Sequence, residues 1–159
     1  MTEPFAAVYT RHAPVVFRRA RRLLGNDADA HEIVQDLFMS LFESPEQFQG
    51  RSALTTFLYT ATTNACLNRI RNQKNRLRLV AENVAADDPE RPLTPEQLTY
   101  LHRLVGAMPE PLGRVVIHYY VDDLSHDDIA RLLGCSRRHV GDLLERVTEW
   151  ARAREGTSC

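Results

Sequence analysis

The stretch Leu124–Trp150, LSHDDIARLLGCSRRHVGDLLERVTEW, contains the start and stop signals of two short helices in succession. Ser125 is a suitable N-cap for the first helix, and Gly134 supplies the left-handed residue that ends it. Ser136 then caps a second helix after the short turn Gly134-Cys135-Ser136. The stretch therefore predicts a helix-turn-helix whose apolar residues recur at helical spacing, namely Ile129, Ala130, Leu132 and Leu133, then Val140, Leu143, Leu144, Val147 and Trp150.

The residues outside these apolar faces give the second helix a basic start. After the capping Ser136 they include Arg137, Arg138, His139 and, two turns later, Arg146. In a DNA-binding helix-turn-helix, the first side chains of the second helix reach base edges in the major groove. Two amphipathic helices joined by a glycine turn also occur in helical bundles that bind no DNA. The segment alone therefore leaves a DNA-binding module and a purely structural bundle open.

The composition is that of a folded protein, because 43% of the 159 residues are hydrophobic. No apolar run approaches the eighteen or so residues that cross a bilayer, and no signal sequence begins the chain, so we expect a cytoplasmic protein without membrane insertion. Cys66, Cys135 and Cys159 are scattered, and neither a disulfide nor a metal site is expected. Because no catalytic motif is present, we expect neither an enzyme nor a cofactor.

Charge is divided unevenly along the chain. The net charge is −1, but residues 1–80 hold 11 basic and 7 acidic side chains, whereas residues 81–159 hold 9 and 14. Between Glu46 and Glu82 no acidic residue occurs, and aromatic residues interleave with the basic ones. Such a segment suits phosphate neutralisation and base stacking, although a solvated charged face is the alternative. Its cations are Arg51, Arg69, Arg71, Lys74, Arg76 and Arg78.

Helical periodicity predicts an all-α chain of two small domains. The first helix is expected over 5–24, with Pro14 as its start or a kink in it. A second helix is expected to begin at Asp27 or Asp29, and a third to span 54–78. An acidic segment with several prolines reads as a linker, so the predicted domains are 1–78 and 96–155 with a linker at 79–95. The second helix carries an apolar stripe that is expected to be buried: Ile33, Val34, Leu37, Phe38, Leu41 and Phe42.

Three motifs in series resemble the extracytoplasmic-function sigma factors of bacterial RNA polymerase. They are DADAHEIVQDLFMSLF, then FQGRSALTTFLYTATTNACLNRIR, and, after the linker, LSHDDIARLLGCSRRHV. In that family the matching patterns look like dAEDlvQevF, FxGxSxxxTWLYxIAxN and LSxxEIAxxLgcSxxTVKsRLxRAR. Each motif alone is weakly specific, but together they cover almost the whole chain in the family's order. The resemblance implies a region-two helical bundle and a region-four helix-turn-helix joined by a flexible linker.

The resemblance also implies roles for residues of the first domain. In the family, one helix presents acidic and glutamine side chains to the clamp of core RNA polymerase, and Glu32, Gln35 and Asp36 occupy the matching positions. The following segment melts the minus-ten element and holds a flipped base in a loop pocket, whose extrusion costs a few kcal/mol. The residues that match this pocket are Phe48, Ser52 and Asn64. Four cations beside the pocket or after it complete the set assigned to minus-ten DNA: Arg51, Arg69, Arg71 and Lys74.

The second domain would meet the minus-thirty-five element through Ser136, Arg137, Arg138, His139 and Arg146. Here the sequence departs from the family pattern in several places, because Gly141, Leu143 and Thr148 stand where lysine or arginine is frequent. Asp142 and Glu145 add repulsion toward DNA, and Phe57 replaces a tryptophan of the first domain. These departures weaken the expectation of tight minus-thirty-five binding more than that of polymerase binding.

Three functions remain open at this level. The first is an alternative sigma factor that binds core polymerase and promoter DNA, both duplex and melted, under the control of an anti-sigma protein. The second is a sigma-like decoy or co-regulator that acts through protein contacts alone. The third is a free-standing helix-turn-helix regulator. This function would not use the basic segment or the helix that matches the family's polymerase-binding helix.

Overall fold

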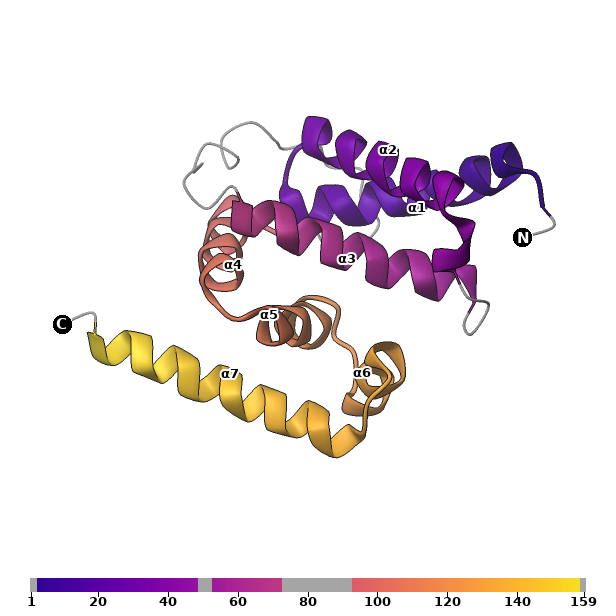
Figure 1. Cartoon of the computed structure of the whole chain (residues 1–159). Helices are drawn as coiled ribbons and strands as arrows, with labels where there is room; N and C mark the ends of the chain where they lie inside the picture. The colour runs from indigo at the N-terminus through magenta and orange to yellow at the C-terminus, as the bar shows by residue number, and fades with distance from the viewer. Residues whose placement is uncertain (1–2, 49–52, 73–92, 158–159) are drawn as a thin grey trace. The chain divides into compact units, whose positions relative to one another are not determined.

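The computed structural model describes residues 3–48, 53–72 and 93–157, and within these ranges every regular element is helical (Figure 1). The all-α prediction is confirmed. The contacts divide the chain into two compact units, Met1–His102 and Arg103–Cys159, with the division inside helix α4 (Pro95–Ala107). Arg51, Ser52, Lys74 and most of the predicted linker lie outside the described residues. None of the described helices is long and apolar enough to cross a membrane.

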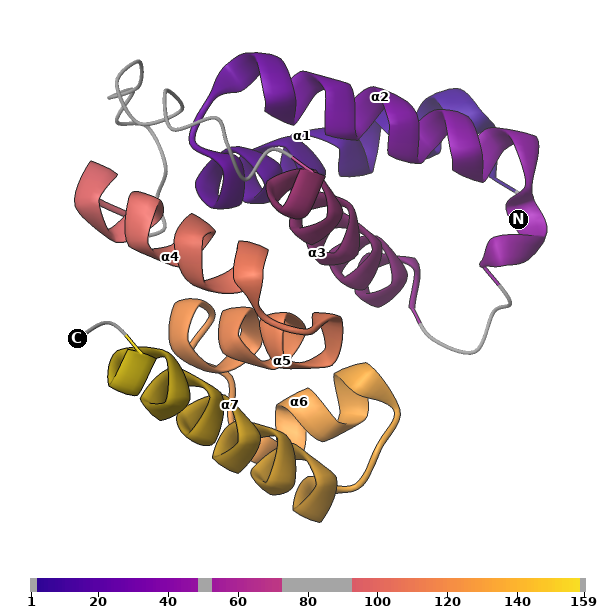
Figure 2. The ribbon, with the colours of Figure 1, turned by 60° about the vertical axis from the view of Figure 1, so that its left-hand side comes forward.

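The first unit contains α1 (Phe5–Leu24), α2 (Asp27–Glu43), the short 3-10 helix η1 (Pro45–Gln47) and α3 (Leu54–Asn72). Figures 1 and 2 show the three long helices packed side by side, with contacts between each pair. Helix α1 runs through Pro14, which therefore does not start it. Gly25, at φ 86°, ends α1, and the side chain of Asn26 caps α2 by accepting from the backbone N–H of Asp29 at 2.8 Å.

Buried residues from all three helices form the core of this unit, among them Val8, Val16, Phe38, Leu41 and Leu58. The predicted stripe on α2 is confirmed for Ile33, Val34, Phe38 and Leu41, while Leu37 is only partly buried. The prediction is wrong for Phe42, whose side chain is 62% exposed. Its ring lies against that of Phe5 with centroids 4.7 Å apart, so it packs on the rim of the unit rather than inside it.

Helix α3 buries two polar residues together with apolar ones such as Leu58, Leu67 and Ile70. Ala61 and Ala65 are half-exposed, while Thr62 and Thr63 are fully buried. Each threonine hydroxyl donates to a carbonyl one turn back, Thr62 to Leu58 at 2.6 Å and Thr63 to Tyr59 at 2.9 Å. Thr63 Oγ1 also accepts from Nε and Nη2 of Arg19, at 3.0 and 2.7 Å. These bonds satisfy the hydroxyls, which removes most of the cost of burying them.

The second unit continues through α5 (Glu110–Val116), the π-helical turn η3 (Ile117–Val121), α6 (His126–Leu133) and α7 (Arg137–Thr157). Figure 2 shows a short turn leading from α6 into α7. Its core is built mainly from branched aliphatic side chains on successive helices: Val105, Leu112, Val115, Ile117, Ile129, Val140, Leu143 and Val147.

Candidate functional site

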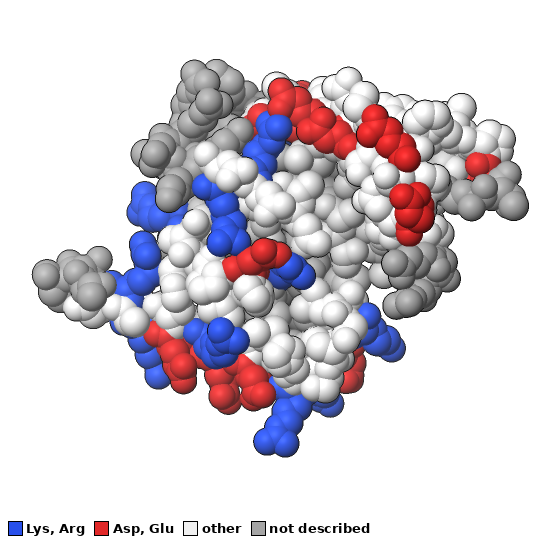
Figure 3. Space-filling view, in the orientation of Figure 1, with Lys and Arg blue, Asp and Glu red and all other residues white. Residues whose placement is uncertain are grey.

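One face of α2 presents the polar residues that were assigned to polymerase binding. Glu32, Gln35 and Asp36 are all exposed, and their spacing of three and four places them on one side of the helix. Figure 3 shows acidic side chains gathered in a row over α2. Asp27 and Asp29 in the first turn add to the acidic character of this helix, and negative charge is favourable at a helix N-terminus.

Two large apolar residues extend this face toward the C-terminus of α2. Met39 and Phe42 are 53% and 62% exposed, and they follow Gln35 by four and seven residues. An exposed apolar patch bordered by polar residues is typical of a protein-binding surface. Sequence reasoning missed both residues, because Phe42 also fits the spacing of the buried stripe. The seven-residue step from Gln35 to Phe42 is the signal that could have identified them.

Arg69 has contacts that its assignment to minus-ten DNA did not anticipate. Its Nη1 lies 2.8 Å from Oδ1 of Asp29, and its Nη2 lies 2.6 Å from Oε2 of Glu32. Partial burial alone lowers the pKa of Arg69, but the hydrogen bonds and charges of Glu32 and Asp29 outweigh it and raise the pKa above its usual value. The guanidinium is therefore held as a cation between two carboxylates of α2.

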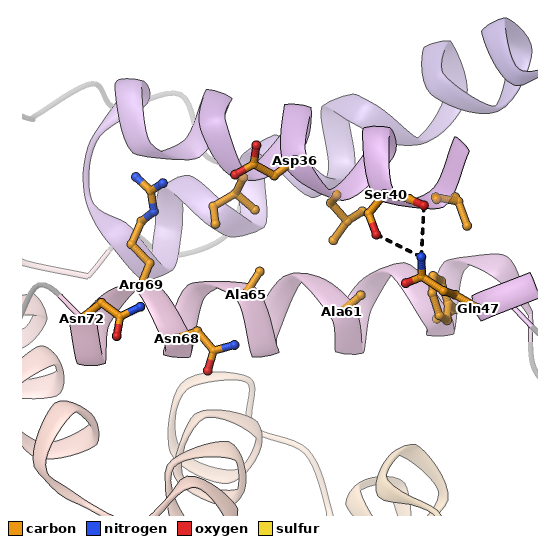
Figure 4. Close-up of a pocket in the computed structure, with 12 residues that line it drawn as sticks. Asp36, Ser40, Gln47, Ala61, Ala65, Asn68, Arg69 and Asn72 are labelled. Atoms are coloured by element: carbon orange, nitrogen blue, oxygen red, sulfur yellow. Dashed lines mark hydrogen bonds between the residues drawn. The ribbon is translucent and has the colours of Figure 1, made fainter. Parts of the chain in front are cut away.

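A cleft of about 420 Å³ separates α2 from α3. Figure 4 shows Ala61 and Ala65 pointing from α3 toward α2, and Arg69 reaching across from the last turn of α3. Asp36 and Ser40 line the cleft from α2. The lining is completed by Ile33, Leu37 and Leu41 of α2, by Gln47, and by Phe57, Asn68 and Asn72 of α3. The side-chain amide of Gln47 donates to the carbonyl and the hydroxyl of Ser40 at 3.0 and 2.9 Å, which fastens η1 to the end of α2.

The predicted flipped-base pocket is described only in part. Phe48 is half-buried, with its ring 5.6 Å from that of Phe57 and packed against the core of the first unit. Asn64 is half-exposed on α3, seven residues beyond Phe57 and thus about 10 Å along the helix. Arg71 is half-exposed in the last turn of α3. Because the loop residues 49–52 are not described, the pocket stays a prediction.

The helix-turn-helix signals read from the sequence are confirmed in α6 and α7. Ser125 Oγ accepts from the backbone N–H of Asp128 at 3.1 Å, and Ser136 Oγ accepts from that of His139 at 3.0 Å. Gly134 adopts the left-handed conformation, with φ 69°. These bonds satisfy N–H groups that a helix start leaves without partners, so the turn between the helices is fixed locally.

The start of α7 is basic and exposed, whereas its later turns are mixed in charge. Arg137, Arg138, His139 and Arg146 are all exposed, and Arg137 Nε lies 3.8 Å from Oδ1 of Asp127. Asp142 and Glu145 are also exposed, on the side of the helix away from its buried residues. Between them and the basic start, a methyl group added at Gly141 meets no other atom within 4 Å. On the helix surface that follows the basic start, the cation Arg146 is therefore accompanied by two acidic side chains that repel phosphate.

The described residues also bear on metal binding and on the state of the buried thiol Cys66. They include no group of three or more His, Cys, Asp or Glu side chains placed to hold a metal ion. Burial raises the pKa of the Cys66 thiol to about 12, which keeps it protonated at neutral pH.

Family comparisons match the two ends of the chain separately. Residues 8–76 match the model of sigma-70 region 2, and residues 98–147 match that of sigma-70 region 4. The ECF RNA polymerase sigma factor SigE of Mycolicibacterium smegmatis is 30% identical over 154 residues, which cover 89% of this chain and 58% of the relative. The ECF sigma factor SigW of Bacillus subtilis is 25% identical over 159 residues, covering 91% of this chain and 83% of SigW. The chain thus spans a little under three fifths of the mycobacterial relative.

A solved structure agrees in fold. The co-crystal structure of the sigma factor RpoE in complex with the anti-sigma factor NepR from Bartonella quintana aligns with a TM-score of 0.51 and 19% sequence identity, covering 91% of this chain and 92% of that one. With sigma-70 regions 2 and 4 both matched in order, the chain belongs to the sigma-70 family, and the curated relatives that it resembles are ECF sigma factors.

Proposed function

We propose that this chain binds core RNA polymerase and directs it to specific promoters, acting as a specificity subunit rather than as an enzyme. The observation that carries the proposal is the presence, on one chain, of an exposed acidic and glutamine face on α2 and a capped helix-turn-helix at α6–α7. Its place of action is then the cytoplasm. The proposed domains are residues 1–78 and 96–155, joined by a linker at 79–95.

Polymerase binding is assigned to Glu32, Gln35 and Asp36, and we add Met39 and Phe42 because they share the exposed side of α2. Apolar side chains at the centre of an interface supply most of its affinity, and the flanking charges orient the partner. The complementary surface on the polymerase should therefore be basic with an apolar centre.

Promoter binding is assigned to both units. Phe48, Ser52 and Asn64 are proposed to hold the extruded minus-ten base, with Arg51, Arg71 and Lys74 on the DNA backbone. The basic start of α7, with Ser136, Arg137, Arg138, His139 and Arg146, is proposed for the minus-thirty-five element. An anti-sigma protein is the proposed regulator, as in the complex of the structural neighbour.

The test combines the purified chain with core polymerase and measures run-off transcription on a promoter library. We expect transcription from a small set of promoters that core enzyme alone does not use. The double variant Gln35→Ala, Asp36→Arg should lose polymerase binding while keeping its helical circular dichroism, because both side chains are exposed. Arg11→Gln, which removes an exposed ion pair with Glu3 on α1, is the matched control and should bind normally.

A decoy that binds polymerase without selecting promoters is the second candidate. It is favoured by the exposed Asp142 and Glu145 on α7, which repel DNA phosphates. Normal polymerase binding with no promoter-specific transcript would support the decoy and contradict the sigma-factor function.

A further inference from the structure

Four side chains connect the start of α2 to the end of α3. The amide Nδ2 of Asn26 donates to Oδ2 of Asp29 at 2.8 Å, and Arg69 donates to Oδ1 of the same carboxylate at 2.8 Å. The second arm of the Arg69 fork reaches Oε2 of Glu32 at 2.6 Å. The network spans forty residues of sequence between Asp29 and Arg69. It therefore joins the helix assigned to polymerase to the helix assigned to minus-ten DNA.

The members of this network differ in exposure, and that difference indicates their roles. The side chains of Arg69 and Asp29 are only 20% and 16% exposed, whereas that of Glu32 is 58% exposed. A partly buried Arg–carboxylate pair is stronger and less screened by salt than a surface pair. Asp29 thus fixes the guanidinium, and the guanidinium in turn holds a carboxylate that still faces solvent.

We propose that Arg69 is a positioning residue for polymerase binding: it holds the Glu32 carboxylate in the orientation that the polymerase meets, and it is not a phosphate contact. The inference rests on the proposed function, since it requires Glu32 to contact polymerase. A free glutamate side chain loses rotamer entropy when it is immobilised in an interface. By fixing Glu32 beforehand, Arg69 removes part of that loss from the binding step.

The geometry also explains why Arg69 differs from its neighbour Arg71. Both lie in the last turn of α3 within the acid-free run, but Arg69 lines the cleft toward α2 and both arms of its fork are engaged by carboxylates. A guanidinium held in this way would have to leave two carboxylates to reach DNA. Arg71, in the same turn, therefore serves as the comparison for a DNA-binding role.

The first experiment is a double-mutant cycle on polymerase affinity, measured with fluorescently labelled full-length chain and core enzyme. Arg69→Gln and Glu32→Gln should each weaken binding about fivefold, and the double variant should be no weaker than Glu32→Gln alone. Arg69→Lys, which keeps the charge but lacks the two-armed fork, should fall between wild type and Arg69→Gln. Arg11→Gln is the control for loss of an unrelated ion pair.

The second experiment measures the salt dependence of holoenzyme binding to promoter DNA. Arg69→Gln should leave the slope of log affinity against log salt unchanged, whereas Arg71→Gln should flatten it by about 0.9. Circular dichroism at the assay temperature verifies that each variant is folded. If the Arg69→Lys and Arg69→Gln chains are folded and bind polymerase normally, or if Arg69→Gln flattens the salt slope, the positioning role is wrong.

The same data separate this inference from the proposed function. If Glu32→Gln binds polymerase as tightly as wild type, the assignment of Glu32 to the interface fails, and the positioning role fails with it. If Glu32→Gln weakens binding but the Arg69 variants lower only the melting temperature, the interface stands and Arg69 is merely a structural link.

Discussion

The Nδ1 atom of His118 lies 3.1 Å from the Oδ2 atom of Asp122, and both side chains are almost completely buried, at 1% and 5% exposure. The pair spans the π-helical turn η3, where the backbone N–H of Asp122 donates to the carbonyl of Ile117 and that of Leu124 donates to His118, both at 3.0 Å. This turn ends at Val121, four residues before the cap of α6 at Ser125. The buried pair therefore sets the direction in which the chain enters the helix-turn-helix.

Replacing Asp122 by alanine should destabilise the second unit by about 1–3 kcal/mol, because it removes a buried hydrogen-bonding partner of His118. Urea unfolding followed by tryptophan fluorescence measures this, since the single tryptophan of the chain, Trp150, lies on α7. Asp142→Ala, an exposed aspartate on the same unit, should change stability by less than about 0.5 kcal/mol. If the two substitutions change the free energy of unfolding equally, the His118–Asp122 pair has no structural role.

Phe42→Ser should weaken the affinity for core polymerase by about tenfold while changing the stability of the chain little, because most of its side chain is already in water. A pull-down titration with core enzyme provides the measurement. Val15→Ser removes an exposed apolar side chain from α1, at 54% against 62% for Phe42, and is the matched control. If the two variants lose affinity to the same extent, Phe42 does not belong to the interface.

Asn64→Ala should impair promoter opening far more than polymerase binding, because the contact that we propose for Asn64 is made only to the extruded base. Permanganate reactivity of melted thymines in the holoenzyme complex reports the opening step. Asn68→Ala, one turn further along α3 and exposed beside the cleft, should leave that reactivity unchanged. Unaltered reactivity in the Asn64 variant would remove this residue from the minus-ten site.

Arg138→Ala should weaken binding selectively at one base pair of the minus-thirty-five element, by about 1–3 kcal/mol, if its guanidinium reads a guanine edge. A panel of single-substitution promoters bound by the holoenzyme resolves this, and Arg137→Ala should affect a neighbouring base pair. Uniform losses over the whole panel would instead indicate that both arginines contact only phosphates.

Gly141→Ala should stabilise α7 by about 0.5–1 kcal/mol, because glycine has a low helix propensity and the added methyl group meets no other atom. Gly141→Lys should in addition raise promoter affinity and steepen the salt slope by about 0.9, the contribution of one new phosphate contact. Thermal unfolding and a salt series of DNA binding measure the two effects. A lysine that leaves the slope unchanged would mean that this side of α7 does not face the duplex.

The features that the sequence predicted correctly depend on neighbouring residues. The caps at Ser125 and Ser136 and the left-handed Gly134 follow from side chains acting within three residues of their own position, so local chemistry is enough to place them. For the same reason, the predicted burial of the apolar stripe on α2 was correct at the centre of the helix. It was wrong at Phe42, which lies against Phe5, the first residue of α1, where that helix no longer covers it.

The features that it could not predict depend on contacts between distant segments. The polar Thr63 can be buried on α3 because Arg19, forty-four residues earlier, supplies a hydrogen-bonding partner. Phe48 was assigned to the flipped-base pocket, which stays a prediction, and only the fold shows that its ring packs on Phe57 and the core. Arg69 belonged to a basic run in the sequence, and only the fold brings it to the carboxylates of α2.

The network around Arg69 has a consequence for the long-range electric field of the unbound protein. Asp29, Glu32 and Arg69 together carry one excess negative charge, so Arg69 adds no net positive potential at this end of α3, in contrast to what its place in a basic run suggests. Steering toward DNA then depends on cations beyond this group. Because electrostatic steering scales with the positive potential near the surface, Arg69 should contribute little to the rate at which the unbound chain meets DNA.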